Sequence, residues 1–273
     1  MDFFSLKDRV IVVTGASGLL GQQHVEAIAI AGGIPILLDL NQNVLDEQVK
    51  QINLKFSIGS KGYAVDITNE DAVRANCIEV TKVFGRIDGL VNNAANNPKV
   101  ENAAEKNFSR LEYFPLLTWE NDLAVGLKGS FICIKYYGFE ISKNPFGGSI
   151  VNISSDLGVI APDQRLYKID GLNEEQQPVK PITYSVVKTG LIGMTKYVAT
   201  YWADKGVRCN ALCPGGVENN QNADFLKAVS FRIPMGRMAR PDEYRGALLF
   251  LLSEASSYMT GAVLSVDGGR TAW

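Results

Sequence analysis

A tyrosine and a lysine four positions apart are the residues best suited to proton transfer. Tyr184 and Lys188 open a helical stretch, in which residues i and i+4 share one face. A phenol has an ordinary pKa of about 10, and a nearby ammonium favours its ionised form. Such a tyrosine can exchange a proton with a substrate oxygen. Ser155, which follows an apolar run, is placed to hydrogen-bond the same oxygen.

A glycine-rich segment, TGASGLLG at 14–21, follows the first apolar run and precedes a helical stretch. Such a turn lets backbone N–H groups and a helix N-terminus face a pyrophosphate. The alternative is a tight strand-to-helix turn without a ligand. The predicted cofactor contacts in this segment are Gly15, Ser17, Gly18, Leu19, Leu20 and Gly21.

Asp39 ends the second apolar run, at the spacing from the glycines typical of a residue that binds a ribose. Its carboxylate can accept from both ribose hydroxyls and would repel a 2′-phosphate. No Arg or Lys lies between Gly15 and Asp39, and the next basic residue is Lys50. The sequence therefore predicts NAD rather than NADP as cofactor, with Leu40 beside it. Asp39 could also cap the next helix, and the two roles are compatible.

Polar residues also follow the third and fourth apolar runs. Because ligands of open α/β sheets bind at the carboxyl ends of the strands, we expect these residues to line one crevice. Asp66 could instead be a helix cap. The predicted contacts here are Asp66, Ile67, Asn92 and Ala94.

Seven apolar runs alternate with helical stretches along the chain. The elements they form must position the candidate catalytic and cofactor-binding residues. The runs are 10–13, 34–38, 63–65, 87–91, 149–153, 207–212 and 262–266, and the helical stretches include 44–52, 70–83, 119–141, 184–203 and 242–253. Such alternation predicts an α/β fold with a doubly wound, parallel seven-stranded sheet and helices on both faces. We expect one domain over 1–273, with long loops at 96–118 and 161–181 shaping the substrate pocket.

Composition excludes several classes of partner. The net charge of −2 gives no basic surface for nucleic acid or anionic lipid. Four scattered cysteines and a single histidine, His24, make a metal site improbable. The chain has no signal peptide and no apolar run of roughly 18 residues. We therefore expect a cytoplasmic protein that binds neither a membrane nor nucleic acid.

In order along the chain, the motifs resemble those of the short-chain dehydrogenase/reductase family, in its compact branch. They are TGASGLLG, Asp66-Ile67, NNAA, ISSDLG, YSVVK, the NALCPG at 210–215, and TG at 260–261 through VDGG at 266–269. The resemblance implies a Rossmann-like fold, a nicotinamide cofactor, a small-molecule substrate and a homo-oligomer, either a tetramer or a dimer.

The resemblance also assigns roles to single residues. Tyr184 corresponds to the catalytic acid/base, and Lys188 to the residue that holds the nicotinamide ribose and lowers the tyrosine pKa. Ser155 corresponds to the partner of the substrate oxygen. Tyr184 and Lys188 thus also contact the cofactor, and the residues that would border the nicotinamide are Pro214, Gly215 and Val217.

Departures from the family pattern affect the site. Gly126 stands where the family usually has an asparagine that anchors a water in a proton relay, and a kink there is expected. Leu19 replaces a common Gly or Ala, so the glycine segment also fits the extended, nucleotide-sugar branch. Asn219 replaces a frequent threonine. Ser155 and Tyr184 are farther apart in the sequence than is usual in the family, and the additional residues are 161–181. This segment contains three cations that could bind an anionic group of the substrate: Arg165, Lys168 and Lys180. The alternative is a surface loop whose charges contact only water.

The sequence therefore predicts an NAD(H)-dependent oxidoreductase that interconverts a secondary alcohol and a ketone. A polar sugar or sugar derivative is the expected substrate, because the C-terminal part also resembles a bacterial subgroup associated with flagellin modification and nonulosonic acid sugars. The alternatives are a 3-oxoacyl-type carbonyl reductase, a non-catalytic NAD(H)-binding regulator and a nucleotide-sugar dehydratase or epimerase.

Overall fold

Seven parallel strands form one sheet in the computed structural model, which describes residues 3–96 and 108–273. Their order across the sheet is β3-β2-β1-β4-β5-β6-β7. The bounds are β1 Val10–Thr14, β2 Ile34–Asp39, β3 Lys61–Ala64, β4 Gly89–Asn92, β5 Gly148–Ile153, β6 Val207–Pro214 and β7 Val263–Val266. The predicted doubly wound parallel sheet is thus confirmed, and each predicted run overlaps a strand.

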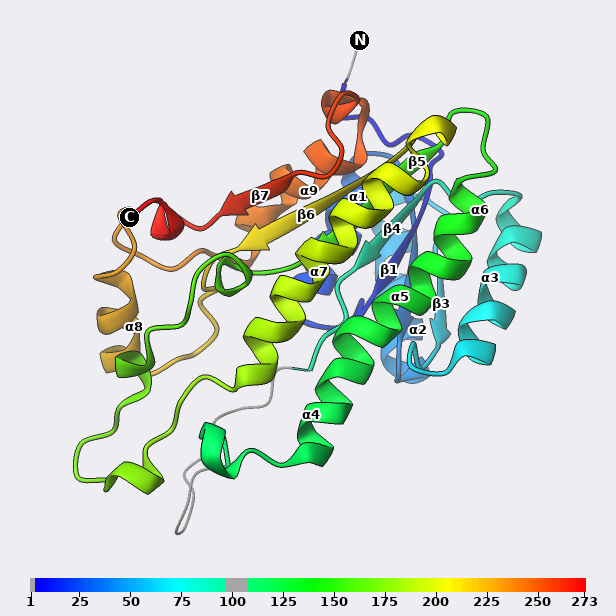
Figure 1. Cartoon of the computed structure of the whole chain (residues 1–273). Helices are drawn as coiled ribbons and strands as arrows, with labels where there is room; N and C mark the ends of the chain where they lie inside the picture. The colour runs from blue at the N-terminus through cyan, green and yellow to red at the C-terminus, as the bar shows by residue number, and fades with distance from the viewer. Residues whose placement is uncertain (1–2, 97–107) are drawn as a thin grey trace.

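Helices cover both faces of the sheet (Figure 1). On one face lie α3 (Glu70–Phe84), α7 (Ile182–Tyr201) and a helical run that contains α4 (Leu116–Leu123), α5 (Ser130–Cys133) and α6 (Phe139–Ile141). On the other lie α1 (Leu19–Ile30), α2 (Gln42–Phe56) and α9 (Arg245–Leu252). Because the central strands are covered twice, β1 and β4 are buried at every position.

The helical run before β5 is not uniformly α-helical. Wider, π-type turns interrupt it at Ala124–Gly129 and Ile134–Gly138, so the continuous helix predicted at 119–141 has two bulges. The first contains Gly126, at which a kink was expected. Such bulges often occur near functional sites.

One helix, α8 (Ala223–Ser230), lies in a region where the sequence suggested none. The Asn222 side chain caps it by accepting from Phe225 N at 2.8 Å. The predicted loop 161–181 contains two short 3₁₀ turns, Gln164–Tyr167 and Glu174–Gln176. Part of the predicted loop 96–118 lies outside the described residues.

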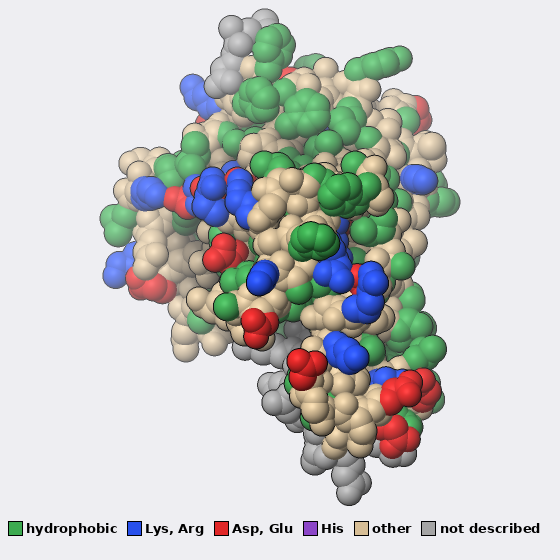
Figure 2. Space-filling view, turned by 90° about the vertical axis from the view of Figure 1, so that its left-hand side faces the viewer, with side chains coloured by type: hydrophobic (Ala, Val, Ile, Leu, Met, Phe, Trp, Pro, Cys, Tyr) green, Lys and Arg blue, Asp and Glu red, His purple; other side chains and the backbone are tan. Residues whose placement is uncertain are grey.

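The strand order reverses between β1 and β4, and at such a switch point open α/β sheets form a crevice. The carboxyl ends of the strands point toward α8 and the beginning of α7 in Figure 1. Figure 2 shows the face with α8, on which acidic and basic side chains are interspersed. Among the described helices, none is both long and apolar enough to cross a membrane.

Candidate active site

The turn between β1 and α1 is built from glycines that leave no room for side chains. Gly15 has a φ of +61°, and a Cβ there would lie 2.9 Å from Ala94 Cα. A Cβ on Gly21 would lie 2.0 Å from the Gly15 carbonyl oxygen. Gly18 precedes α1 without a side-chain cap, which leaves the first N–H groups of the helix to other acceptors. This arrangement fits a dinucleotide pyrophosphate.

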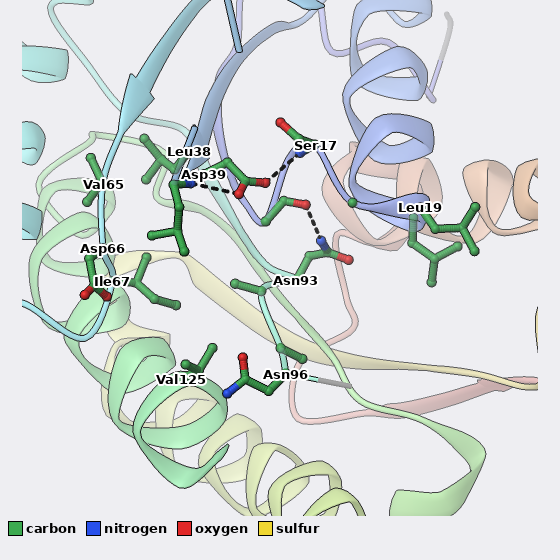
Figure 3. A pocket seen from close by; sticks show the side chains of 16 residues that line it. Ser17, Leu19, Leu38, Asp39, Val65, Asp66, Ile67, Asn93, Asn96 and Val125 are labelled. Atoms are coloured by element: carbon green, nitrogen blue, oxygen red, sulfur yellow. Dashed lines mark hydrogen bonds between the residues drawn. The ribbon is translucent and has the colours of Figure 1, made fainter. Parts of the chain in front are cut away.

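A cavity of about 530 Å³ opens beside this turn (Figure 3). The Asp39 carboxylate faces it and accepts from the backbone N–H groups of Ser17 and Leu40, at 2.9 and 2.8 Å. Asp39 is therefore held at the end of β2 by the glycine turn itself. The other predicted contacts that line the cavity are Gly15, Gly18, Leu19, Leu20, Asp66, Ile67 and Ala94.

Two of the predicted cofactor residues line neither this cavity nor the second one, described below. Gly21 lies behind the turn, and Asn92 is buried with its Nδ2 donating to Asn152 Oδ1 at 2.8 Å. The neighbouring Asn93, which the sequence analysis did not single out, lines the cavity. Its Nδ2 donates to the Thr14 and Gly15 carbonyl oxygens, both at 3.0 Å, and so fixes the glycine turn to β4.

A second cavity, of about 340 Å³, is lined by the residues that the sequence analysis predicts to be catalytic. Ser155, Tyr184 and Lys188 all line it, as do Pro214, Gly215 and Val217 at the end of β6. The two cavities share Leu19, Leu20 and Asn93. The pyrophosphate cradle therefore continues into the space in front of Tyr184, as an extended dinucleotide requires.

Lys188 is held in the protein interior. Its Nζ donates to the Ile153 carbonyl oxygen at 2.8 Å and lies 5.7 Å from the Tyr184 ring centre. Burial lowers the pKa of the Lys188 ammonium to about 8. For Tyr184, burial raises the phenol pKa, the hydrogen bond with Ser155 lowers it, and the Asp156 charge raises it. The pKa of the Tyr184 phenol is therefore raised in this structure, whereas the sequence analysis expected Lys188 to lower it.

A buried ion pair adjoins Ser155. The Ser155 hydroxyl donates to Asp156 Oδ1 at 2.7 Å, and Arg270 Nη1 contacts Asp156 Oδ2 at 2.9 Å. Both charged side chains line the second cavity. The sequence analysis missed this pair, because the two residues are separated by 114 positions.

The segment 161–181 and α8 together form one wall of the second cavity. Leu166 packs in a small apolar cluster with Val229, Ile233 and Met238, apart from the two clusters that flank the sheet. Arg232 Nε donates to Asp163 at 2.6 Å and ties the segment to the end of α8. The segment 161–181 thus helps to line the second cavity, and its role in shaping a substrate pocket stays a prediction.

Of the three cations predicted to meet an anionic group, only Lys180 lines the cavity. Its Nζ lies 3.8 Å from the Tyr184 ring centre, and burial lowers its pKa to about 8. Arg165 is largely exposed and pairs with Asp163. Lys168 is exposed. Asn219, the third departure noted in the sequence, also lines the cavity.

Gly126 lines a smaller cavity together with Tyr184 and Val187. A Cβ at position 126 would lie 2.3 Å from Val187 Cγ1, so α7 packs directly on the π-type turn. One helical turn earlier, the buried Asp122 accepts from Thr183 Oγ1 at 2.6 Å. Among the described residues, no group of three or more His, Cys, Asp or Glu side chains could hold a metal ion.

Comparison with characterised proteins agrees with this arrangement. The NAD-dependent glycerol dehydrogenase of Listeria innocua is 31% identical over 98% of this chain and 96% of its own. The 3-oxoacyl-(acyl-carrier-protein) reductase FabG of Aquifex aeolicus is 31% identical over 97% of this chain and 98% of its own. A crystal structure of gluconate 5-dehydrogenase from Burkholderia cenocepacia, in complex with NADP and tartrate, superposes with a TM-score of 0.85 at 26% identity, covering 100% of this chain and 98% of that one.

Two family models match different parts of the chain. The one for enoyl-(acyl carrier protein) reductase matches residues 173–271. The one for short chain dehydrogenases matches residues 9–167, the part that carries the glycine turn, Asp39 and Ser155. The narrower resemblance to the flagellin-modification subgroup receives no support from these comparisons. The chain belongs to the short-chain dehydrogenase/reductase family of oxidoreductases.

Proposed function

We propose that this protein is an NAD(H)-dependent oxidoreductase that interconverts a secondary alcohol and a ketone on a polar, polyol- or sugar-like substrate. The observation that carries the proposal is the placement of Ser155, Tyr184 and Lys188 in one cavity that continues into the dinucleotide cradle. When bound there, NAD supplies the hydride acceptor.

The residues that line the two cavities each have a role in this proposed reaction. Tyr184 takes the hydroxyl proton during oxidation and returns it during reduction. Lys188, fixed on the Ile153 carbonyl, places positive charge beside the phenol and is in position to hold the nicotinamide ribose. Pro214, Gly215 and Val217 would border the nicotinamide, and the glycine turn would bind the pyrophosphate.

Asp39 supports NAD over NADP. Its carboxylate lines the first cavity and would repel a 2′-phosphate, and both of its oxygens are held by backbone N–H groups. Relatives include one that uses NAD and one crystallised with NADP, so the choice rests on this carboxylate.

The polar substrate is supported by the cavity wall. Asp156, Lys180, Asn219 and Arg270 surround the space in front of Tyr184, and such groups bind hydroxyl and carboxylate oxygens better than an acyl chain. A 3-oxoacyl-type reductase remains the second candidate, favoured by the identity to the Aquifex enzyme. Self-association into a dimer or tetramer stays a prediction, which light scattering would check.

The test is cofactor absorbance during turnover by the purified protein, with NAD and NADP in turn. The panel holds glycerol, threitol, xylitol, gluconate and an acetoacetyl thioester, and Tyr184→Phe serves as the control. We expect turnover of a polyol or sugar acid with NAD and none in the control. Turnover of the thioester alone would favour the acyl reductase. NADH binding without turnover of any compound would favour the non-catalytic regulator.

A further inference from the structure

The guanidinium of Arg270 has N–H groups for which the described protein provides no acceptor. An arginine side chain carries five N–H donors in a fixed, planar arrangement. Nη1 donates to Asp156 Oδ2 at 2.9 Å, whereas Nε and Nη2 have no hydrogen-bond partner among the described residues. The side chain is 9% exposed and lines the second cavity, so these donors are open to that cavity rather than sealed in the interior. A ligand oxygen there would satisfy them.

The Tyr167 hydroxyl is a second donor on the same cavity. Tyr167 belongs to 161–181, lines the cavity and packs its ring against Phe225, with ring centres 5.9 Å apart. Within the described part of the chain its hydroxyl has no hydrogen-bond partner. Burial raises the pKa of this phenol to about 12, the Arg270 charge lowers it and Tyr184 raises it. Tyr167 therefore keeps its proton at neutral pH and lies within electrostatic range of both Arg270 and Tyr184.

The charges around the second cavity do not balance. Of the described side chains that line it, Asp156 is the only acidic one, whereas three are cationic: Lys180, Lys188 and Arg270. Burial lowers the pKa of both lysines to about 8, so at neutral pH most molecules still carry both charges. An anionic group on the substrate would compensate part of this positive excess, whereas an uncharged polyol would not.

We propose that Arg270 and Tyr167 bind a carboxylate of the substrate, so that the protein oxidises small hydroxy acids of the sugar-acid type in preference to uncharged polyols. This inference rests on the proposed function of the same cavity. The planar fork of an arginine binds a carboxylate through two parallel hydrogen bonds, and Nε and Nη2 form the edge of the fork that is left over. The Tyr167 hydroxyl would donate a third hydrogen bond.

The reacting carbon would lie close to this anchor. Asp156 accepts from Ser155 through Oδ1 and from Arg270 through Oδ2, so a single carboxylate separates the anchor from the serine beside Tyr184. During oxidation the hydride leaves the carbinol carbon for NAD and the hydroxyl proton passes to Tyr184. The substrate carboxylate stays bound and chemically unchanged.

The experiment compares acids with polyols of the same carbon chain: gluconate with sorbitol, xylonate with xylitol, and threonate with threitol. Each compound is titrated by calorimetry at pH 7 into Tyr184→Phe saturated with NAD, in which we expect no turnover. At least one acid should bind about tenfold more tightly than its polyol, because hydrogen bonds to a charged group are the stronger ones. Equal binding within all three pairs, or binding of no acid, would overturn the proposal.

Arg270→Lys, made in the same background, tests the anchor and keeps a cation beside Asp156. Lysine has no planar fork, so the preference for the acid should fall by about tenfold. The matched control is Arg165→Lys, since Arg165 is largely exposed and does not line the cavity. A preference that both substitutions leave intact would contradict the assignment to Arg270.

Tyr167→Phe keeps the ring against Phe225 and leaves the Arg270 ion pair in place, so it tests the site even if Arg270→Lys fails to fold. It should lower the preference for the acid by about threefold or more. Lys180→Met examines the other cation near Tyr184. Loss of the preference in Lys180→Met, with full retention in Arg270→Lys and Tyr167→Phe, would assign the carboxylate to Lys180 and overturn the proposal.

Turnover by the wild-type protein separates this inference from the proposed function. Acids that bind through Arg270 and are never oxidised would leave the carboxylate site standing and contradict the oxidoreductase assignment. Turnover of polyols with NAD, without any preference for the corresponding acids, would do the reverse.

Discussion

Gly126 and Val187 are in direct contact, since a Cβ at position 126 would lie 2.3 Å from Val187 Cγ1. The glycine belongs to the π-type turn before α5, and the valine precedes Lys188 in α7. The asparagine that the family usually has at this position could not be accommodated while Val187 keeps its place. The departure at Gly126 is therefore matched by the packing of α7, which brings Tyr184 and Lys188 close to this helical run.

A methyl group at position 126 should destabilise the protein, although alanine is normally the better helix former. The stiff, branched Val187 side chain must shift, and overpacking of this kind costs about 1–3 kcal/mol. Gly193 in α7 is the matched control, because a Cβ there meets nothing within 4 Å. Gly193→Ala should stabilise by roughly 0.5–1 kcal/mol. Urea denaturation compares both variants with wild type, and equal effects of the two would contradict the packing argument.

Asp39→Asn should relax the choice of cofactor. The amide keeps an oxygen for one of the two backbone N–H groups that Asp39 now binds, but loses the charge that repels a 2′-phosphate. Removing like-charge repulsion of a few kcal/mol should raise the NADP-to-NAD ratio of kcat/KM by about tenfold or more. The measurement is initial rates with each cofactor. An unchanged ratio at unchanged melting temperature would show that Asp39 does not set the preference.

Oxidation should become faster as the pH rises through the alkaline range, because the Tyr184 pKa is raised and the phenolate is the base. Lys180 Nζ lies 3.8 Å from the ring centre, but burial lowers its pKa to about 8, so its charge can stabilise the phenolate only below about that pH. Asp156, Arg270 and Lys188 line the same cavity and contribute to the field at the phenol.

Lys180→Met keeps the apolar stem over the ring and removes the ammonium. Below pH 8, where the wild-type ammonium is charged, the kcat/KM for oxidation should fall by up to about tenfold, and well above pH 8 the two proteins should agree. The measurement is alcohol oxidation across pH, with exposed Lys168→Met as the control. Equal kcat/KM values for the two proteins below pH 8 would mean that Lys180 has no electrostatic role toward Tyr184.

The buried His24 should make the protein sensitive to acid. Burial lowers the pKa of its imidazole to about 3 from 6.5, and neither ring nitrogen has a hydrogen-bond partner among the described residues. The unfolded chain thus binds the proton more readily, so this contribution to stability is present above pH 6.5 and declines as the pH falls toward 3. At pH 5 the loss is about 2 kcal/mol.

His24→Met removes this titration and should flatten the pH dependence of stability over that range. Chemical denaturation at pH 7.5 and 5 gives the free energy of unfolding for both proteins. The difference between wild type and variant isolates His24 from the other groups that titrate. An equal change in the free energy of unfolding between the two pH values in both proteins would show that protonation of His24 does not destabilise the folded state.

Much of the framework is predictable from the chain alone, because long apolar runs and glycine spacing are local signals. The seven strands, the glycine turn, Asp39 and the cavity with Ser155, Tyr184 and Lys188 lie where those signals indicate. The sequence predicts a kink at Gly126 but not the π-type turn found there, because that turn depends on the packing of α7 against the run.

Other parts of the site depend on contacts between distant residues. No local sequence signal predicts that Arg270 contacts Asp156, or that Lys180 rather than Lys168 lines the second cavity. Asn92 and Asn93 are neighbours of the same type, and only the alternation of β4 decides that the first is buried while the second faces the cofactor cavity.

The wall formed by 161–181 and α8 has a consequence for exchanging parts between related enzymes. Leu166 completes an apolar cluster with Val229, Ile233 and Met238, and Asp163 is bound by Arg232. A chimera that takes only 161–181 from another family member would leave those four partners facing a foreign surface. We therefore expect that the stretch around α8 has to be exchanged together with 161–181 for the apolar cluster and the Arg232–Asp163 contact to be kept.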